Sequence, residues 1–311
     1  MKQFGSILLA LASLPLLGAA PPRSDVERAF RAQTPARHQG YRDTCAVFSI
    51  VAIIEAYLLR DGLADTNLDF SEEWLQYLAG RSSFGESSFI EQDYELIRMY
   101  GLADESLYPY SKQVPYRKNP KLIEASDEEL LDKASKLYDP AFQAARADAR
   151  RKLPNLLPHL GGIETIPYEE AKAHLARGEF LLLELDFYCG AWNHNCAGDL
   201  GIGRDLTQHN MGVVGFPAPG SLDEKISRQH PSKHSILLIG YDDSVSVPTR
   251  VKMNNGELKE FRYQGVFYFK NSLGTYFGKT FNFGGKPYPG FGMITQEYVM
   301  RYGKLLKLNW R

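Results

Sequence analysis

The sequence lacks an excess of charge of either sign. Its 36 lysine and arginine residues face 37 aspartate and glutamate residues, which leaves a formal net charge of -1. Proteins that bind nucleic acid usually carry a basic surplus that neutralises phosphates. Low-complexity and repeated segments are absent as well, which excludes collagen-like and repeat-array folds. We therefore expect a globular protein without a nucleic-acid partner.

Long hydrophobic runs are also missing. Residues 7–17 are apolar except for Ser13 and Pro15, but a helix needs about 20 residues to span a bilayer. The charge of Lys2 before this run and the small residues after it indicate a secretory signal peptide over residues 1–20. We expect the domain at 21–311 to be secreted or periplasmic, without a membrane anchor; a buried N-terminal helix is the alternative.

Cysteine is scarce, with only three residues in the chain. Cys189 and Cys196 lie seven apart in a segment rich in glycine and asparagine, and exported thiols tend to pair. We expect a disulfide between them. Free thiols remain an alternative, as does a metal site with His194, which lacks a fourth ligand. Cys45 is then the odd cysteine, either an intermolecular link or a reactive thiol.

Cys45 begins the most hydrophobic stretch of the mature chain. Apolar residues occupy nearly every position of 45–59, which predicts a buried helix that ends at the glycine following Arg60 and Asp61. The thiol would lie at the amino end of this helix, where free N–H groups and the helix dipole favour the thiolate. The alternative is an ordinary core cysteine.

A thiolate nucleophile needs a base and a group that orients the base. Among seven histidines, only His234 directly precedes an apolar strand, at 235–241. Asn271 follows another predicted strand, at 265–270, and its amide can accept the N–H of His234 and fix the tautomer. Each residue alone is also compatible with an ordinary strand end.

Together these motifs resemble the papain-like cysteine peptidase family. Gln39 and Cys45 keep the spacing of that family's oxyanion glutamine and nucleophile, and Phe48 and Ser49 match its active-site helix. Residues 234–241 and 270–278 resemble the family's histidine and asparagine motifs. The likeness runs in order from about residue 36 to 300.

The resemblance implies an α+β fold with two lobes and the active site in a cleft between them. The helical lobe would contain the helix at 45–59. The antiparallel, β-barrel-like lobe would contain strands at 180–187, 235–241 and 265–270. No cofactor or metal is expected.

The implied activity is hydrolysis of peptide bonds by a monomeric, exported enzyme through a thioester at Cys45. His234 would serve as the base and Asn271 would orient it. The side chain of Gln39 and the N–H of Cys45 would stabilise the oxyanion. The substrate, a peptide or protein, is expected to contact Gly85, Ser87, Ser88 and Ser235. The alternatives are an amidase or acyltransferase that acts on cell-wall peptides, and an inactive peptide-binding protein.

Three positions depart from the family pattern. Ala46 replaces an aromatic residue, and Leu273 replaces the tryptophan that shields the bond between histidine and asparagine. We expect the bond between His234 and Asn271 to be weaker for that reason. Asp43 places a negative charge near the thiol and opposes its ionisation.

The spacing of the motifs predicts two insertions. His234 follows Cys45 by 189 residues, against about 130–150 in the family. Residues 111–160 are charged and predict two helices, one with a capping box at Ser126 and one from Pro140 to about Lys152 that ends before Pro154 and Pro158. Residues 247–263 predict a hairpin around an Asn-Asn-Gly turn. We expect 111–160 to form a rim of the cleft and the enzyme to need no proteolytic maturation.

Overall fold

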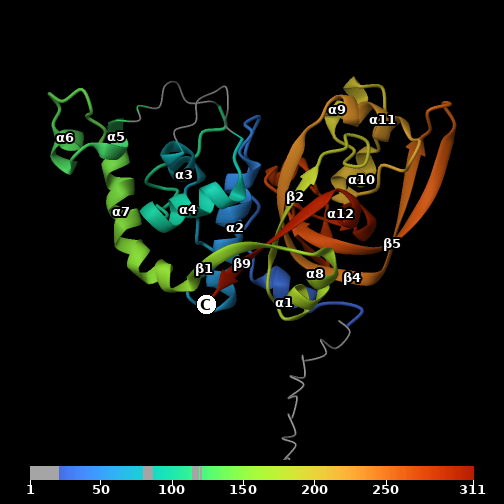
Figure 1. Ribbon diagram of the computed structural model, residues 1–311, viewed down its shortest axis with the longest axis horizontal. Coiled ribbons are helices and arrows are strands. Elements are labelled where there is room, and N and C mark those ends of the chain that lie inside the picture. The colour runs from blue at the N-terminus through green and yellow to red at the C-terminus, as the bar shows by residue number, and fades with distance from the viewer. Residues whose placement is uncertain (1–20, 80–86, 114–118, 120) are drawn as a thin grey trace, which may run out of the picture.

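The structure is a computed structural model that describes residues 21–79, 87–113, 119 and 121–311 (Figure 1). The predicted signal peptide at 1–20 and the predicted substrate contact Gly85 lie outside the described residues. A helical lobe and a β lobe lie side by side, as the α+β expectation requires. None of the helices in the described residues is long and apolar enough to cross a bilayer.

The helical lobe is built around α2 (Cys45–Arg60), which confirms the predicted buried helix. Apolar side chains are buried on all of its faces, because α3 (Glu72–Leu78) and α4 (Ile90–Tyr100) cover one side and the sheet covers the other. The helix ends at Arg60, and Gly62 adopts the left-handed conformation (φ 69°) expected of a glycine stop.

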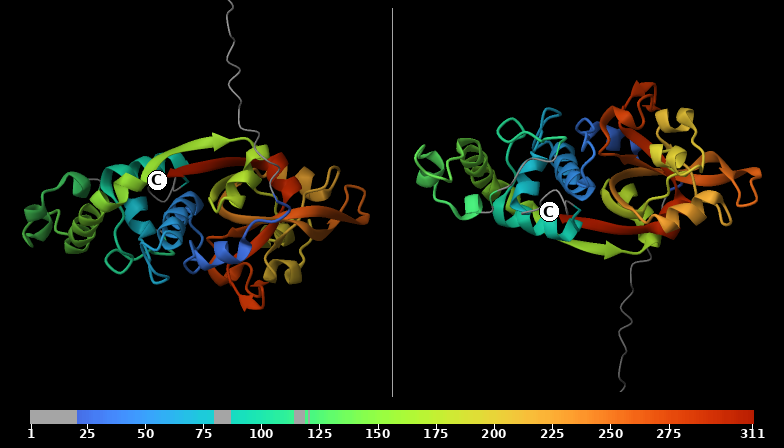
Figure 2. Two further views of the ribbon diagram at one scale, coloured as in Figure 1. Left: turned by 90° about the horizontal axis from the view of Figure 1, so that it is seen from below. Right: turned by 90° about the horizontal axis from the view of Figure 1, so that it is seen from above.

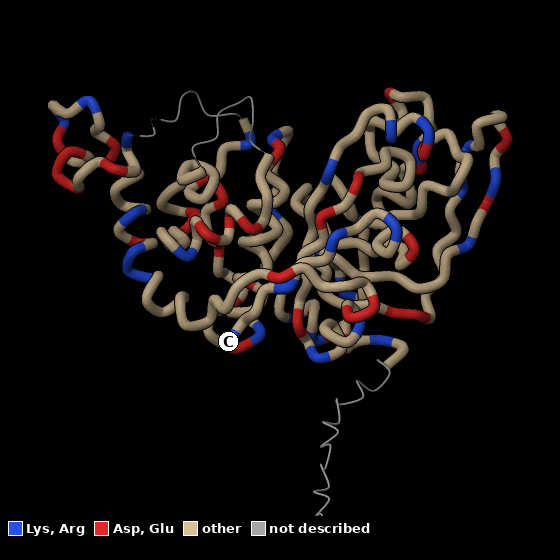
Figure 3. Tube along the Cα trace, in the orientation of Figure 1, with Lys and Arg blue, Asp and Glu red and all other residues tan. Residues whose placement is uncertain are grey.

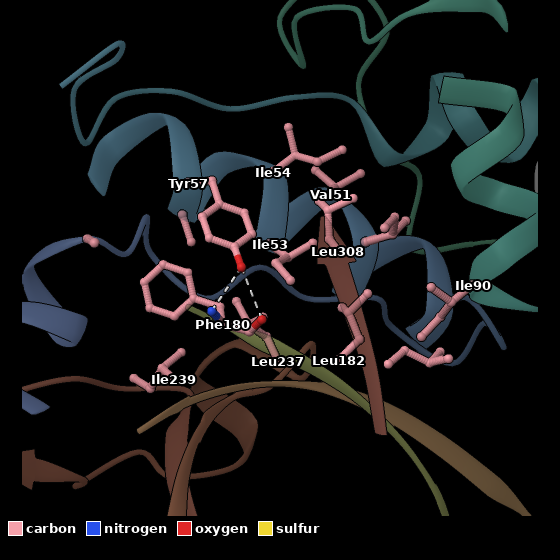
Figure 4. Close-up of a cluster of buried hydrophobic side chains, with 14 of the residues drawn as sticks. Val51, Ile53, Ile54, Tyr57, Ile90, Phe180, Leu182, Leu237, Ile239 and Leu308 are labelled. Carbon is pink, nitrogen blue, oxygen red and sulfur yellow. Dashed lines mark hydrogen bonds between the residues drawn. The ribbon is translucent and has the colours of Figure 1, made fainter. Parts of the chain in front are cut away.

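The sheet side of α2 fixes the two lobes against each other. Figure 4 shows Tyr57 with its hydroxyl between the two backbone polar groups of Phe180: the hydroxyl accepts from the N–H at 3.0 Å and donates to the carbonyl at 3.2 Å. Trp310 stacks on the same tyrosine at 5.2 Å between ring centroids. Cys45 is therefore carried by a helix whose position relative to the β lobe is set by burial and by hydrogen bonds.

The segment 111–160 contains α5 (Lys121–Glu124), α6 (Asp127–Leu131) and α7 (Pro140–Leu156), followed by the 3-10 helix η1 (Leu157–His159). The capping box at Ser126 is confirmed. The predicted stop before Pro154 is wrong, since α7 continues through it to Leu156. A proline inside a helix removes one backbone hydrogen bond and crowds the carbonyl one turn earlier, but Pro154 lies in the last turn of α7, two residues before its end at Leu156.

Helix α7 packs its buried face against Trp74 and Tyr77 on the outer side of the helical lobe, and α5 and α6 lie at the end far from the β lobe (Figure 1). None of the described residues of 111–160 lines the cleft between the lobes. The expectation that this segment forms a rim of the cleft is therefore wrong for the residues described. The reason is that its apolar residues find their partners on the outer side.

The β lobe contains a seven-stranded sheet in the order β1-β9-β2-β4-β5-β8-β3. Its strands are β1 (Leu160–Ile166), β2 (Leu181–Asp186), β3 (Val213–Val214), β4 (Lys233–Lys252), β5 (Leu258–Lys270), β8 (Phe291–Thr295) and β9 (Gly303–Trp310). All neighbouring pairs are antiparallel except β3 with β8. The two edge strands, β1 and β3, do not pair, so the sheet is open rather than a closed barrel.

The predicted strands are found in β2, β4 and β5. The last two continue into a long hairpin that pairs Lys252 with Leu258 around the expected tight turn, which confirms the hairpin prediction. Strand β1 runs from the helical lobe into the β lobe, and β9 returns antiparallel to it toward the helical lobe, as the two views in Figure 2 show. The smaller elements of this lobe are α1 (Val26–Arg31), α8 (Tyr168–Ala176), β6 (Asn282–Phe283), β7 (Lys286–Pro287), the 3-10 helix η2 (Gly274–Tyr276) and α12 (Gln296–Tyr302).

The connection between β2 and β4 contains α9 (Asn195–Asp199), α10 (Leu206–Asn210) and α11 (Leu222–Gln229), none of which the sequence analysis predicted. These helices have five to eight residues, too few for a clear hydrophobic period. The connection begins with the disulfide between Cys189 and Cys196, as expected. These two sulfur atoms are bonded to each other, so the alternative of a metal site on two thiolates does not apply.

Candidate active site

A cleft of about 940 Å³ separates the two lobes at the amino end of α2. The three motifs that lie far apart in the sequence meet in its walls. The sequence-predicted residues that line it are Gln39, Asp43, Cys45, Ser87, Ser88, His234, Ser235 and Leu273. Asn271 lies behind this wall, buried and bonded to His234.

Cys45 is the first residue of α2, and its thiol lies against the start of β4. Burial raises the pKa of this thiol above its ordinary value. Hydrogen bonds with the backbone and hydroxyl of Ser235 and with the backbone of Ala46 lower the pKa, and the charge of Asp43 raises it. The helix amino terminus alone favours the thiolate, but burial outweighs it and favours the neutral thiol.

His234 is the second residue of β4 and is buried, with 7% of its surface exposed. Its Nε2 donates a hydrogen bond to Oδ1 of Asn271 over 2.8 Å, so the amide fixes the tautomer and leaves Nδ1 free to accept a proton. Burial lowers the pKa of His234 to about 4, although the bond to Asn271 acts in the opposite direction. The imidazole is therefore neutral at physiological pH.

Asn271 follows β5 directly, and its orientation is fixed by the backbone around it. The N–H of Ser272 donates to the same Oδ1 that accepts from His234, over 2.8 Å. The preceding residue, Lys270, is buried and donates to the hydroxyl of Thr34, which in turn donates to Glu55 of α2. The amide is thus held in place relative to the helix that carries Cys45.

Gln39 lies in the loop before α2, and both ends of its side-chain amide have partners. Nε2 donates to the carbonyl of Arg42 over 2.6 Å, and Oε1 accepts from the hydroxyl of Ser272 over 2.5 Å. The backbone N–H of Gln39 also donates to the carbonyl of Ser272, over 2.8 Å. Nε2 carries two hydrogens, so one N–H remains for an oxygen bound in the cleft.

The same loop is held by a buried ion pair that the sequence analysis missed. Arg42 lies 2.5 Å from the carboxylate of Glu73 in α3, and its guanidinium packs over the ring of Tyr110 at 4.6 Å. Arg42 also donates to the carbonyl of Ser111. A buried charge of this kind is stable only with such partners, and the result is a rigid loop between Gln39 and Cys45.

An aromatic side chain from a distant segment covers His234. Trp192 lies inside the disulfide loop, is 1% exposed and packs edge to face with the imidazole at 5.3 Å between ring centroids. Phe187 packs in the same manner at 5.8 Å. Trp192 and Phe187 thus give the imidazole an aromatic cover that does not depend on Leu273, and the weaker bond between His234 and Asn271 stays a prediction. The sequence feature that could have indicated this contact is the position of Trp192 between Cys189 and Cys196.

The disulfide loop is attached to the lobe by a buried carboxylate. Asp223 of α11 accepts hydrogen bonds from the backbone of Gly190 at 2.8 Å and of Ala191 at 2.7 Å, and also from the hydroxyl of Ser227. These bonds lower the pKa of Asp223, but burial raises it by more. Gly190 and Ala191 lie immediately before Trp192 in the sequence, so Asp223 fixes the backbone that carries this tryptophan.

The predicted substrate contacts Ser87, Ser88 and Ser235 differ in exposure and in their hydrogen-bond partners. Ser88 lines the cleft, but its hydroxyl already donates to the buried Asp93 over 2.5 Å. Ser87 is exposed at the cleft wall, and Ser235 is buried against the thiol of Cys45. Among the residues that the structure describes, no group of three or more histidine, cysteine or acidic side chains is placed to hold a metal ion.

Comparison with solved structures identifies the fold of this chain, whereas comparison of sequences finds no match. No protein-family model and no curated protein matches the sequence. Xylellain, a cysteine protease from Xylella fastidiosa, superposes with a TM-score of 0.56 and 15% identity over 99% of this chain and 94% of its own. Digestive procathepsin L 3 of Tenebrio molitor superposes with a TM-score of 0.52 and 14% identity, over 94% of this chain and 72% of its own.

A cysteine protease from Carica candamarcensis, solved in complex with E-64, has a TM-score of 0.50 and 16% identity over 94% of this chain and 100% of its own. The similarity to these proteins covers both lobes. The chain therefore has the papain-like two-lobe fold, with the sheet open at β1 and β3.

Proposed function

We propose that this chain, with its papain-like fold, is an exported cysteine peptidase that hydrolyses peptide bonds through a thioester at Cys45. The observation that carries the proposal is the hydrogen bond from Nε2 of His234 to Asn271, in a cleft that Cys45 and Gln39 also line. This arrangement combines a nucleophile, a base with a fixed tautomer, and donors for an oxyanion.

The proposed first step starts from the neutral pair. As the sulfur of Cys45 bonds to the carbonyl carbon, its proton moves to Nδ1 of His234, and the carbonyl oxygen becomes an oxyanion. The remaining N–H of the Gln39 amide and the backbone N–H of Cys45 donate to that oxyanion. One such donor contributes about 3 kcal/mol to the stability of the transition state.

In the second step the imidazolium returns the proton to the leaving amine, the C–N bond breaks and the thioester remains. Water then attacks the thioester, with neutral His234 accepting its proton, and the protonated imidazole restores the thiol. The raised pKa of Cys45 and the lowered pKa of His234 support this assignment, because both shifts disfavour charge on the pair in the resting state.

Export is part of the proposal and rests on two features. The N-terminal residues 1–20 have the composition of a signal peptide, and the disulfide between Cys189 and Cys196 is stable in an oxidising compartment. The carbonyl of Pro21 accepts a hydrogen bond from the hydroxyl of Tyr241, so the described chain contacts the β lobe from this residue onward.

The test is hydrolysis of unfolded protein and of cell-wall peptide fragments by the purified chain beginning near Pro21, alongside the Cys45→Ala variant. We expect cleavage of the unfolded protein, and a loss of at least a thousandfold in the variant. Cleavage of wall fragments alone would make the enzyme an amidase of that material. Binding of peptides without cleavage of either substrate would make it an inactive binding protein.

A further inference from the structure

The charged side chains in the walls of the cleft are paired, with one exception. Among the described residues, the charged residues that line it are Arg42, Asp43, Glu184, Asp186, Lys233, Arg301 and Lys304. Lys233 lies 2.9 Å from Asp186, and Lys304 lies 3.1 Å from Glu184. Both signs are also interspersed along the two lobes as a whole (Figure 3).

The two arginines of the wall have partners as well. Arg42 is paired with Glu73 inside the helical lobe, and Arg301 lies 3.6 Å from Glu297 on its own helix. Asp43 is exposed and has no cation within 4.0 Å among the residues that the structure describes. It is therefore the charge of the described cleft wall that is left without a counter-charge.

The position of Asp43 allows its unpaired charge to disfavour ionisation of the Cys45 thiol. It lies two residues before Cys45, in the loop that also carries Gln39, and its charge raises the pKa of the thiol. In the free enzyme it therefore opposes development of negative charge on the sulfur. A cation brought by the substrate removes this cost at the moment when the sulfur reacts.

We propose that Asp43 selects peptides with lysine or arginine at the residue that supplies the scissile carbonyl. This inference rests on the proposed function and names its substrate class. The side chain of that residue extends from the carbon bonded to the carbonyl, beside the loop that joins Gln39 to Cys45. A carboxylate there binds a guanidinium through two hydrogen bonds or an ammonium as a point charge.

The test compares two peptides that differ only at this residue, one with arginine and one with its neutral isostere citrulline. We expect kcat/KM to be about tenfold higher for arginine, the scale of one charge-assisted bond in a partly desolvated cleft. Asp43→Asn reduces the ratio to near one by lowering the rate on the arginine peptide. Asp43→Glu restores much of the preference. Asp186→Asn, which removes a paired carboxylate of the same cleft, leaves the ratio unchanged.

A second measurement keeps the test independent of turnover. The rate of alkylation of Cys45 by iodoacetamide, followed against pH, shifts to lower pH in Asp43→Asn because the thiol loses a neighbouring negative charge. If the wild type cleaves both peptides equally and Asp43→Asn changes neither rate, the inference is wrong while the peptidase stands. If the folded wild type cleaves neither peptide, the proposed function fails.

Discussion

The indole of Trp192 packs edge to face against the imidazole of His234, with the ring centroids 5.3 Å apart. Leu273, beside the asparagine, is the residue that the sequence pattern puts in place of a shielding tryptophan. The cover instead comes from a loop closed by the disulfide of Cys189 and Cys196 and anchored by Asp223. Structural support for His234 is thus supplied by a segment that the sequence motifs do not include.

Trp192→Leu is expected to lower kcat about tenfold with a smaller effect on KM. Removing the ring admits water to the bond between His234 and Asn271, weakens it and reduces the burial that holds the histidine pKa near 4. The acid limb of the pH profile of kcat/KM therefore moves toward the ordinary histidine value. Trp74→Leu, which removes a buried indole from the helical lobe, is the matched control. An acid limb that moves equally in both variants would show that Trp192 contributes only to general stability.

His234→Ala is expected to reduce kcat nearly as far as Cys45→Ala, and Asn271→Ala by about tenfold to a hundredfold. The base takes part in both proton transfers, whereas the amide only fixes the tautomer and orientation through its 2.8 Å bond. His230→Ala serves as the control, because that histidine is exposed. Steady-state kinetics with folding checked by circular dichroism measures these effects. A larger loss for His230→Ala than for His234→Ala contradicts the assignment of the base.

Activity is expected to fall as the pH drops through about 4, since protonated His234 cannot accept the thiol proton. The free energy of unfolding also depends on the protonation of His234. Its folded pKa lies below the unfolded value near 6.5, so the unfolded chain takes up a proton first, and stability is lost as the pH falls from about 6.5 to 4. The shift corresponds to about 3 kcal/mol. Urea unfolding at several pH values measures this loss, and His234→Gln should reduce it. An equal loss in that variant would assign the effect to other groups.

One thiol per chain is expected when the folded protein, made in an oxidising compartment, is unfolded in denaturant without reductant and titrated. Cys45 is the free cysteine, and the bond between Cys189 and Cys196 contributes about 2–3 kcal/mol. The double variant Cys189→Ser/Cys196→Ser should lose that stability and also lose kcat, because the loop carries Trp192. Three titratable thiols in the protein made in that compartment would refute the pairing in solution.

Local patterns predicted a large part of this fold. The buried helix α2 could be recognised because apolar residues fill every face of a segment with the length of a helix. The hairpin of β4 and β5 was indicated by its tight turn, and the capping box at Ser126 by the spacing of two polar side chains. In each of these elements the residues that determine the structure are close together in the sequence.

The parts that could not be predicted depend on contacts between distant residues. The packing of Trp192 on His234, the ion pair of Arg42 with Glu73 and the position of α7 on the outer side of the helical lobe have no local signal. The raised pKa of Cys45 has the same origin, because burial by the second lobe opposes the helix terminus. The continuation of α7 through Pro154 also shows that a local helix breaker in the last turn need not end the helix before it.

The central claim is that Cys45 is a nucleophile activated by His234, and covalent labelling tests it most directly. The protein beginning near Pro21 is incubated with an epoxide inhibitor of the E-64 type, digested and analysed by mass spectrometry, in parallel with His234→Ala and the control His230→Ala. The account predicts one adduct on Cys45, formed rapidly in the wild type and in His230→Ala and at least a hundredfold more slowly in His234→Ala. Equal labelling rates in all three proteins, or no adduct on Cys45 of the folded wild type, would contradict it.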